Sequence, residues 1–136
     1  MVVHAIKTYV LLIPLHLPPS LYYCLSGIKN INFIIFRPAE FTEKVINSKK
    51  QAVVFFFAIW AGSCKMMRPV FEKFSKDYPS IEFYDVDVDN LRQLSEDLGN
   101  TTVPTFLFFK DGAQLNNLTV PGAYTQNLMN SLAALS

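Results

Sequence analysis

One segment, residues 51–60, constrains the fold of this chain more than any other, because nine of its ten residues are apolar. The run is rich in Val and Phe, which favour strands, and it shows no alternation of apolar with polar residues. A strand that is apolar on both sides has to be covered on both faces of its sheet. The segment therefore predicts a strand in the interior of the fold.

Residues 38–136 alternate between helical and strand patterns. Apolar residues at helical spacing mark the helices, and short apolar runs mark the strands. A tight-turn signal, Lys110, Asp111 and Gly112, separates the last two strands. This alternation implies an α/β fold with a mixed sheet. The predicted helices are 38–47, 63–76, 90–98 and 124–135, and the predicted strands are 51–60, 81–89, 103–109 and 115–120.

The second predicted helix carries three further expectations. The Ser63 hydroxyl is expected to cap its first turn. Its apolar residues, Met66 and Met67 among them, are expected to face the core. Pro69 removes a backbone donor inside the helix and is therefore expected to kink it.

Composition narrows the class of protein. The 136 residues are 51% hydrophobic and 17% charged, which suits a single globular core. A formal net charge of +1 without a basic block gives no reason to expect binding to nucleic acid or acidic lipid. Two cysteines, Cys24 and Cys64, are too few for the disulfide framework of a small secreted protein.

The residues around Cys64 have the setting of a redox-active disulfide but only one thiol. Residues 60–65 read Trp-Ala-Gly-Ser-Cys-Lys. In a Cys-X-X-Cys pair, the first thiol attacks a disulfide and the second resolves the resulting mixed disulfide. Ala61 occupies the first position, so the attacking thiol is absent.

Several spaced motifs in residues 38–136 resemble those of thioredoxins. Their order and spacing make the resemblance more specific than any one motif. It implies the thioredoxin fold, a central mixed sheet flanked by helices on both faces, with the redox loop between Trp60 and the helix that follows. The matching positions are residues 60–65, Pro69, residues 87–89, residues 102–105, residues 108–112 and Gly122.

The resemblance assigns roles to individual residues. Trp60 matches the tryptophan that shields the site and touches protein substrates, and Cys64 matches the resolving cysteine. Pro104 matches a proline held in the cis form, and the backbone of the preceding residue, Val103, pairs with an extended substrate segment. Gly122 matches a glycine of the third loop of the groove. The expected substrate-binding residues are Trp60, Gly62, Ser63, Val103, Pro104 and Gly122.

The resemblance also implies two losses. Thioredoxins carry a buried aspartate, which assists deprotonation of the resolving thiol, at the position of Phe55. A lysine that commonly neighbours this aspartate corresponds to Asp85. Cys64 is therefore expected to lack its usual base unless Asp85 reaches it, and a shielded thiol in apolar surroundings is a poor nucleophile.

Two functions from different classes follow. The first is that of a thioredoxin-like protein-disulfide oxidoreductase in cell redox homeostasis, with dithiol exchange lost or crippled by Ala61. The second is that of a redox-inactive module that binds extended protein segments. We expect no cofactor and no metal, because His4 and His16 have no ligand-type residues beside them. The expected partners are proteins with extended segments or disulfides, and a thioredoxin reductase only if a dithiol were present.

Residues 1–37 are predicted to be an extension that precedes the thioredoxin-like domain, residues 38–136. Residues 2–7 resemble the short first strand of thioredoxins, and residues 38–41 resemble the start of the helix that should follow at once. We hypothesise that residues 9–37 are translated intron sequence or a recent insertion. Codons at their edges can encode a splice donor and an acceptor, and removing these 29 residues leaves a thioredoxin-sized chain of 107. Comparison of genomic and transcript sequences tests this hypothesis.

The insertion, if translated, offers a substitute first strand and a possible targeting segment. Residues 31–36 are an apolar run that could replace residues 2–7. Residues 8–28 carry no charge, which would suit a signal peptide or membrane anchor, although Pro14, Pro18 and Pro19 interrupt them. The expected location is the cytoplasm, with secretion or anchoring through residues 8–28 as the alternative.

Overall fold

A computed structural model of the chain describes residues 33–136 and shows a six-stranded mixed sheet. The strand order is β1-β3-β2-β4-β5, and β6 pairs with β4. The first three of these strands are mutually parallel, and β4 runs antiparallel to β2. The strands are β1 (Phe33–Ile35), β2 (Ala52–Phe57), β3 (Glu82–Asp87), β4 (Thr105–Lys110), β5 (Ala113–Gln114) and β6 (Val120–Pro121).

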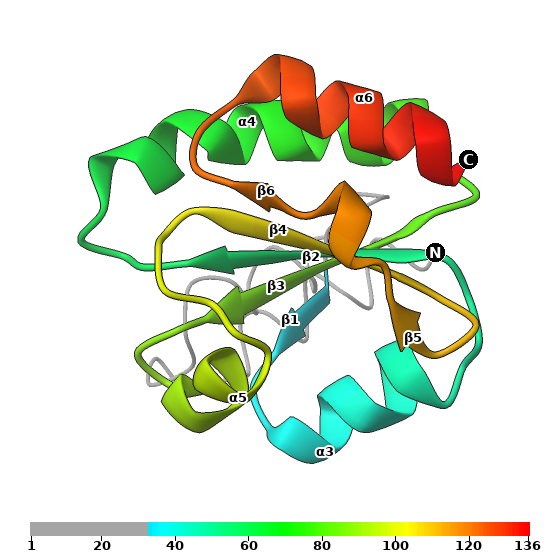
Figure 1. Cartoon of the computed structure of the whole chain (residues 1–136). Helices are drawn as coiled ribbons and strands as arrows, with labels where there is room; N and C mark the ends of the chain where they lie inside the picture. The colour runs from blue at the N-terminus through cyan, green and yellow to red at the C-terminus, as the bar shows by residue number, and fades with distance from the viewer. Residues whose placement is uncertain (1–32) are drawn as a thin grey trace, which may run out of the picture.

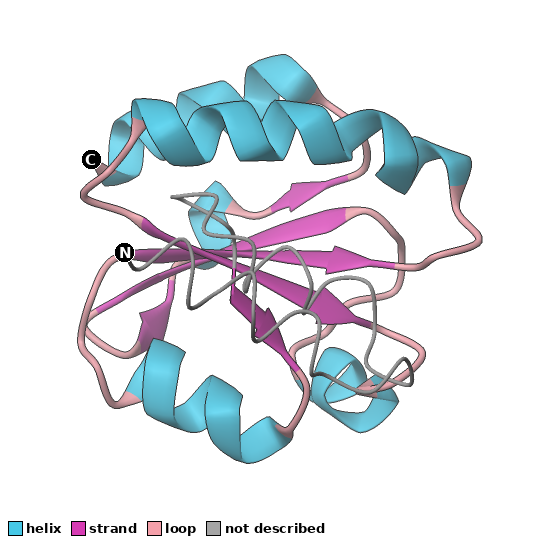
Figure 2. Ribbon diagram, turned by 180° about the vertical axis from the view of Figure 1, so that it is seen from behind, coloured by secondary structure: helices cyan, strands magenta, loops and turns pink. Residues whose placement is uncertain are grey.

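Helices cover both faces of this sheet. Helices α4 and α6 lie over one face, and α3 and α5 lie over the other (Figures 1 and 2). The predicted mixed sheet flanked by helices on both faces is therefore confirmed. The helices are α3 (Pro38–Phe41), which continues into the π-helical turn η1 (Thr42–Ile46), α4 (Gly62–Asp77), α5 (Arg92–Asp97) and α6 (Thr125–Leu135).

Alternate residues of β2 pack into two separate halves of the core. Val53 and Phe55 belong to the half that contains the apolar residues of α4 and α6. Val54 and Phe56 belong to the half that contains those of β1 and α3. None of these four side chains is exposed to solvent. The uninterrupted apolar run of the sequence is thus explained by a strand that is buried on both faces.

The edge strand β1 comes from the part of the chain just before α3. Its residues pair in parallel with Tyr84, Asp85 and Val86 of β3, and Ile35 is buried. The prediction that residues 31–36 can supply a first strand is confirmed by Phe33–Ile35. Residues 2–7 and 8–28 lie outside the described residues. Within residues 33–136, no helix combines the length and the hydropathy that crossing a membrane requires.

The predicted strand at residues 115–120 is wrong. The chain instead pairs briefly in β5, forms the 3-10 turn η2 (Asn116–Leu118) and pairs again in β6. The Leu115 amide donates to the carbonyl of Phe108, and the Thr119 amide donates back to that of Asn116. Two adjacent asparagines favour such a turn over continued pairing. The tight turn before it is confirmed, with Asp111 at φ 54° and Gly112 at φ 82°.

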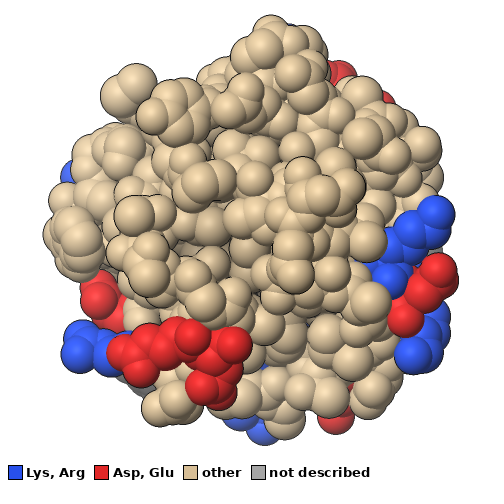
Figure 3. Space-filling model, viewed as in Figure 1, with Lys and Arg blue, Asp and Glu red and all other residues tan. Residues whose placement is uncertain are grey.

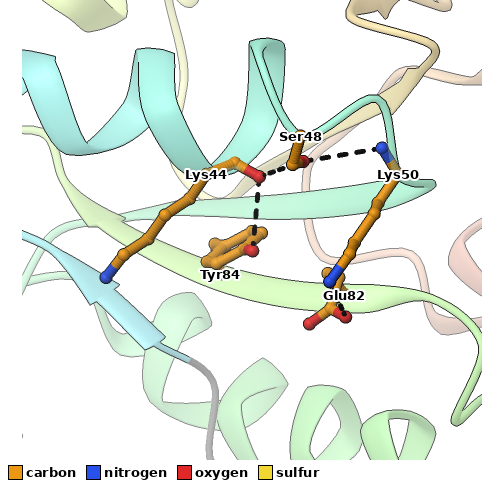
Figure 4. A network of polar contacts seen from close by, with 5 residues as sticks. All are labelled: Lys44, Ser48, Lys50, Glu82 and Tyr84. Carbon is orange, nitrogen blue, oxygen red and sulfur yellow. Dashed lines mark hydrogen bonds and ion pairs between the residues drawn. The ribbon is translucent and has the colours of Figure 1, made fainter.

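A small polar network ties η1 to β3 (Figure 4). The Lys44 carbonyl accepts hydrogen bonds from the Ser48 hydroxyl and, at 3.4 Å, from the Tyr84 hydroxyl. The Ser48 oxygen accepts from the Lys50 amide, and the Lys50 ammonium lies 3.7 Å from a carboxylate oxygen of Glu82. Burial and then the charge of Glu82 raise the pKa of Tyr84 to about 12.

Replacing Tyr84→Phe should make the fold less sensitive to alkali. A phenol with a raised pKa holds its proton more tightly in the folded chain than in the unfolded chain. Its contribution is therefore complete below the ordinary pKa of 10.0 and is lost as the pH rises toward about 12. That loss amounts to about 2 to 3 kcal/mol at most, at 1.36 kcal/mol per pKa unit.

Urea unfolding at about pH 8 and about pH 11 measures this difference. The free energy of unfolding should fall less between the two pH values in the variant than in the parent chain. An equal fall in both proteins would show that Tyr84 does not contribute to alkaline unfolding.

Candidate functional site

Three loops converge at the end of the sheet where β2 terminates. Residues 58–61 join β2 to α4, and the loops that precede β4 and follow β6 lie at the same end (Figure 1). Crevices at the carboxyl ends of sheet strands are common binding sites in α/β proteins. Residues 60–65, singled out from the sequence, therefore stand in a setting where a ligand can be held.

Ala61 is the last residue before α4 begins. Its backbone is extended, at φ −84° and ψ 117°, and its amide donates to the Ala58 carbonyl. No side chain caps the helix, so the prediction that Ser63 does so is wrong. The reason is that α4 starts at Gly62, one residue earlier than predicted, which places Ser63 inside the first turn. The first-turn amides consequently keep the partial positive charge of a helix start.

Cys64 lies on the inner side of α4, where its side chain is 3% exposed. It shares the core half of α4 and α6 with Ala61 and Phe55. Burial raises the pKa of the Cys64 thiol, and this effect outweighs a backbone hydrogen bond with Ala58 and the nearby charge of Arg68, which both lower it. The thiol is therefore protonated at neutral pH and reacts slowly as a nucleophile.

Trp60 stands at the surface, with 71% of its area exposed. Its indole nitrogen donates a hydrogen bond of 2.9 Å to a carboxylate oxygen of Asp89. The Asp89 amide in turn donates to a carboxylate oxygen of Asp87, also at 2.9 Å. The indole ring is thus fixed in orientation while most of its face stays available for contact. Residues 87–89 were among the motifs that match thioredoxins, but nothing in the sequence indicated that Asp89 is the hydrogen-bond partner of Trp60.

Val103, Pro104 and Gly122 come together on the other side of this loop region. The Val103–Pro104 peptide bond is cis. The Gly122 amide donates to the Pro104 carbonyl at 2.7 Å, and Val103 packs against the core half that includes Ala61 and Cys64. These three predicted substrate-binding residues therefore lie in the loops before β4 and after β6, at the same end of the sheet as residues 58–61.

Large apolar side chains are exposed around this region. Ile59 and Met66 are each 70% exposed, and Tyr124 is 60% exposed. The expectation that Met66 faces the core is wrong, whereas Met67 is buried as expected. Cys64, Met67, Phe71 and Phe74 are spaced for one face of a helix, and Met66 lies about 100° away from it. Sequence reasoning did not identify Ile59 or Tyr124.

On the face of the molecule that carries β6 and α6, these two elements hold no charged side chain. Figure 3 shows acidic and basic side chains toward its margins and none over these two elements. This agrees with the sequence, which contains no Asp, Glu, Lys or Arg from Gly112 to Ser136. The loop after β6 and helix α6 therefore contribute no charged side chain to a ligand bound there.

The carboxylates of β3 and the residues after it each have a partner in the protein. A carboxylate oxygen of Asp85 lies 2.7 Å from a guanidinium nitrogen of Arg68 on α4. Asp87 accepts from the Asp89 amide and the Asn90 side chain. Within residues 33–136, no three His, Cys, Asp or Glu side chains are grouped to hold a metal ion.

Comparison with known proteins identifies relatives across most of the described chain. Residues 32–134 match the thioredoxin family. Thioredoxin-1 of Saccharomyces cerevisiae is 37% identical over 99 residues, which cover 73% of this chain and 94% of that protein. The thioredoxin of Malassezia sympodialis is 41% identical over 93 residues, which cover 66% of this chain and 86% of that protein.

The structural comparison agrees with the sequence comparison. The crystal structure of Malassezia sympodialis thioredoxin, Mala s 13, matches with a TM-score of 0.71 and 35% identity over 79% of this chain and 92% of that chain. A structure of Plasmodium falciparum thioredoxin matches with a TM-score of 0.72 and 33% identity over 76% of this chain and 99% of that chain. The chain therefore belongs to the thioredoxin family of disulfide oxidoreductases and adopts the thioredoxin fold.

Proposed function

We propose that this thioredoxin-family protein has lost dithiol exchange and binds extended protein segments in the groove between Trp60 and the loops of Pro104 and Gly122. The observation that carries the proposal is Ala61. It occupies the last position before α4, where the family resemblance places the attacking cysteine, and its methyl group has no nucleophilic atom. Without a first thiol, no mixed disulfide forms for a second thiol to resolve.

The state of Cys64 supports the same conclusion. The thiol is almost fully buried and its pKa is raised. Phe55, at the position where the resemblance places the buried acid, stacks on Phe106 with a ring-centroid distance of 4.8 Å. Asp85, the remaining carboxylate, is engaged by Arg68. Both the nucleophile and its base are therefore missing from the places where dithiol exchange needs them.

The groove nevertheless keeps features suited to an extended segment. No residue of the described chain forms a backbone hydrogen bond with the amide or carbonyl of Val103. Free backbone groups of this kind pair with an added peptide strand. Trp60 and Tyr124 offer exposed aromatic surface, which is typical of residues that dominate protein interfaces. The proposed partners are protein segments, and a thioredoxin reductase becomes a partner only when a dithiol is present.

Restoring the first thiol tests the loss of exchange. In an insulin disulfide reduction assay, the parent chain should show no turnover above the uncatalysed rate. Ala61→Cys should gain turnover, which stays partial because Phe55 supplies no base. The control Ala61→Cys/Cys64→Ser has an attacking thiol without a resolving thiol and should not sustain turnover. Catalytic turnover by the parent chain would contradict the proposal.

Binding without exchange is tested with a peptide that carries no disulfide. The carbamidomethylated insulin B chain, titrated by calorimetry, should bind the parent chain. Its affinity for Trp60→Ala should be lower by a factor of about ten or more. Lys50→Gln alters an exposed side chain just before β2, at the opposite end of that strand, and should bind like the parent. Equal affinities in the parent and Trp60→Ala, or no binding to the parent, would overturn the docking function.

Gly122 lies in the loop after β6, where its backbone conformation and its neighbours leave no room for a side chain. Its φ of +101° is unfavourable for other residues, and an added Cβ would lie 2.7 Å from a ring carbon of Tyr124. Gly122→Ala should therefore cost about 1 kcal/mol or more of unfolding free energy and displace the Tyr124 ring. Gly62→Ala is the matched control, because its Cβ meets nothing within 4 Å and its place in a helix favours Ala by about 0.5 to 1 kcal/mol.

Urea unfolding of the two glycine variants measures these opposite effects. Gly62→Ala should unfold at the same or a higher urea concentration than the parent, and Gly122→Ala at a lower one. Equal stability of the two variants would show that the backbone at Gly122 is not constrained.

A further inference from the structure

The methionines of residues 33–136 differ in how far solvent can reach them. Met66 is 70% exposed, Met129 is 38% exposed, and Met67 is 2% exposed. The Met67 sulfur also accepts a hydrogen bond of 3.7 Å from the Thr125 hydroxyl, so this side chain is held between α4 and α6. Because oxidation of a side-chain sulfur depends on access to it, Met66 is the thioether that an oxidant in solution reaches most easily.

Cys64, two residues earlier on α4, is poorly suited to react with the same oxidant. Peroxides react with the thiolate form of a cysteine. Burial raises the pKa of this thiol, and its side chain is almost fully enclosed, so the thiolate is scarce and hard to reach at neutral pH. Near the start of α4, the sulfur that meets an oxidant is therefore the thioether of Met66.

Met66 lies beside the groove of the proposed docking function. Gly62, the first residue of α4, is exposed and is one of the predicted substrate-binding residues. Residues four apart share one side of a helix, so Met66 continues the surface of Gly62 by one turn. The contact between Met67 and Thr125 brings the start of α6, which directly follows Tyr124, against the same turn of α4. A segment bound between Gly62 and Tyr124 is therefore expected to pass next to Met66.

We propose that Met66 is an oxidant-responsive site: a hydroperoxide converts its thioether to the sulfoxide, and the sulfoxide weakens the binding of extended protein segments in the groove. Oxidation turns a flexible apolar side chain into a polar one at the edge of that groove. The effect on binding rests on the docking function proposed above, whereas the choice of Met66 as the oxidised residue does not.

The reaction balances without any other reactant. The Met66 sulfur attacks one oxygen of the peroxide, a sulfur–oxygen bond forms, and the oxygen–oxygen bond breaks. The second oxygen leaves as water or an alcohol and takes up the proton that the attacked oxygen releases. The sulfur loses two electrons and the peroxide gains them.

Peptide mass spectrometry after treatment with hydrogen peroxide at neutral pH tests the choice of residue. The full chain carries Cys24→Ser, so that any thiol oxidation reports on Cys64. The sulfoxide of Met66 should form while Met67 and Cys64 remain reduced. Oxidation of Met67 or Cys64 as fast as that of Met66, or faster, would overturn the proposal.

The carbamidomethylated insulin B chain, which contains no methionine, measures the effect on docking once the peroxide has been removed. Its affinity for the treated chain should be at least about threefold lower, because a sulfoxide has to give up water to enter an apolar contact. Methionine sulfoxide reductases A and B should restore the affinity. Met66→Leu should show the same affinity before and after treatment. Met129→Leu, the matched control on α6, keeps Met66 and should lose affinity as the parent does.

Urea unfolding separates a loss of docking from a loss of folding. The treated and untreated chains should unfold at the same urea concentration, because Met66 faces solvent. A lower concentration after treatment would overturn the proposal, since oxidation would then act through the fold. A loss of affinity in Met66→Leu as large as in the parent would also overturn it. Unchanged affinity of the treated parent would overturn this inference and leave docking intact, whereas no binding by the untreated parent would overturn docking and, with it, the effect on binding.

Discussion

The burial of β2 on both faces is the constraint on which the rest of this structure depends. The strand pairs with β3 on one side and β4 on the other, so its backbone groups are satisfied within the sheet. Its side chains then alternate between two halves of the core, and each half is closed by a different pair of helices. Because the strand cannot shift by one residue without exchanging its two faces, the position of the loop at its end is fixed as well.

That loop explains why the site could be located from the sequence. The apolar run of β2 and the helical spacing that follows it place residues 60–65 at a strand-to-helix junction, and the structure has this junction at residues 58–61. The order of strands and helices could also be predicted from the sequence, because helices and strands differ in the spacing of their apolar residues. The sequence did not predict the path of residues 115–120, because turn-forming asparagines there interrupt an otherwise apolar pattern.

The electrostatic part of the site depends on contacts that no local pattern contains. Arg68 and Asp85 are 17 residues apart and meet only when α4 packs on the sheet. Phe55 and Asp85 are register partners on β2 and β3, so the buried carboxylate stands one strand away from the position at which the family resemblance expects an acid. Phe55 occupies that position instead, stacked on Phe106 and in tilted contact with Phe71. The residue types at these two positions led us to expect that the acid is missing, but only the packing shows that Arg68 is the partner of Asp85.

The short edge strand β1 has a consequence for how this chain selects its first strand. Phe33–Ile35 occupy the place beside β3, whereas the sequence resemblance assigned the first strand to residues 2–7, which lie outside the described residues. Only two residues separate Ile35 from Pro38, whereas 30 residues separate Lys7 from Pro38. Closing the longer loop costs roughly 2 kcal/mol more in chain entropy, since the cost grows with the logarithm of loop length. The segment that lies next to α3 in the sequence is therefore favoured by proximity alone, which accounts for an edge strand of only three residues directly before the helix.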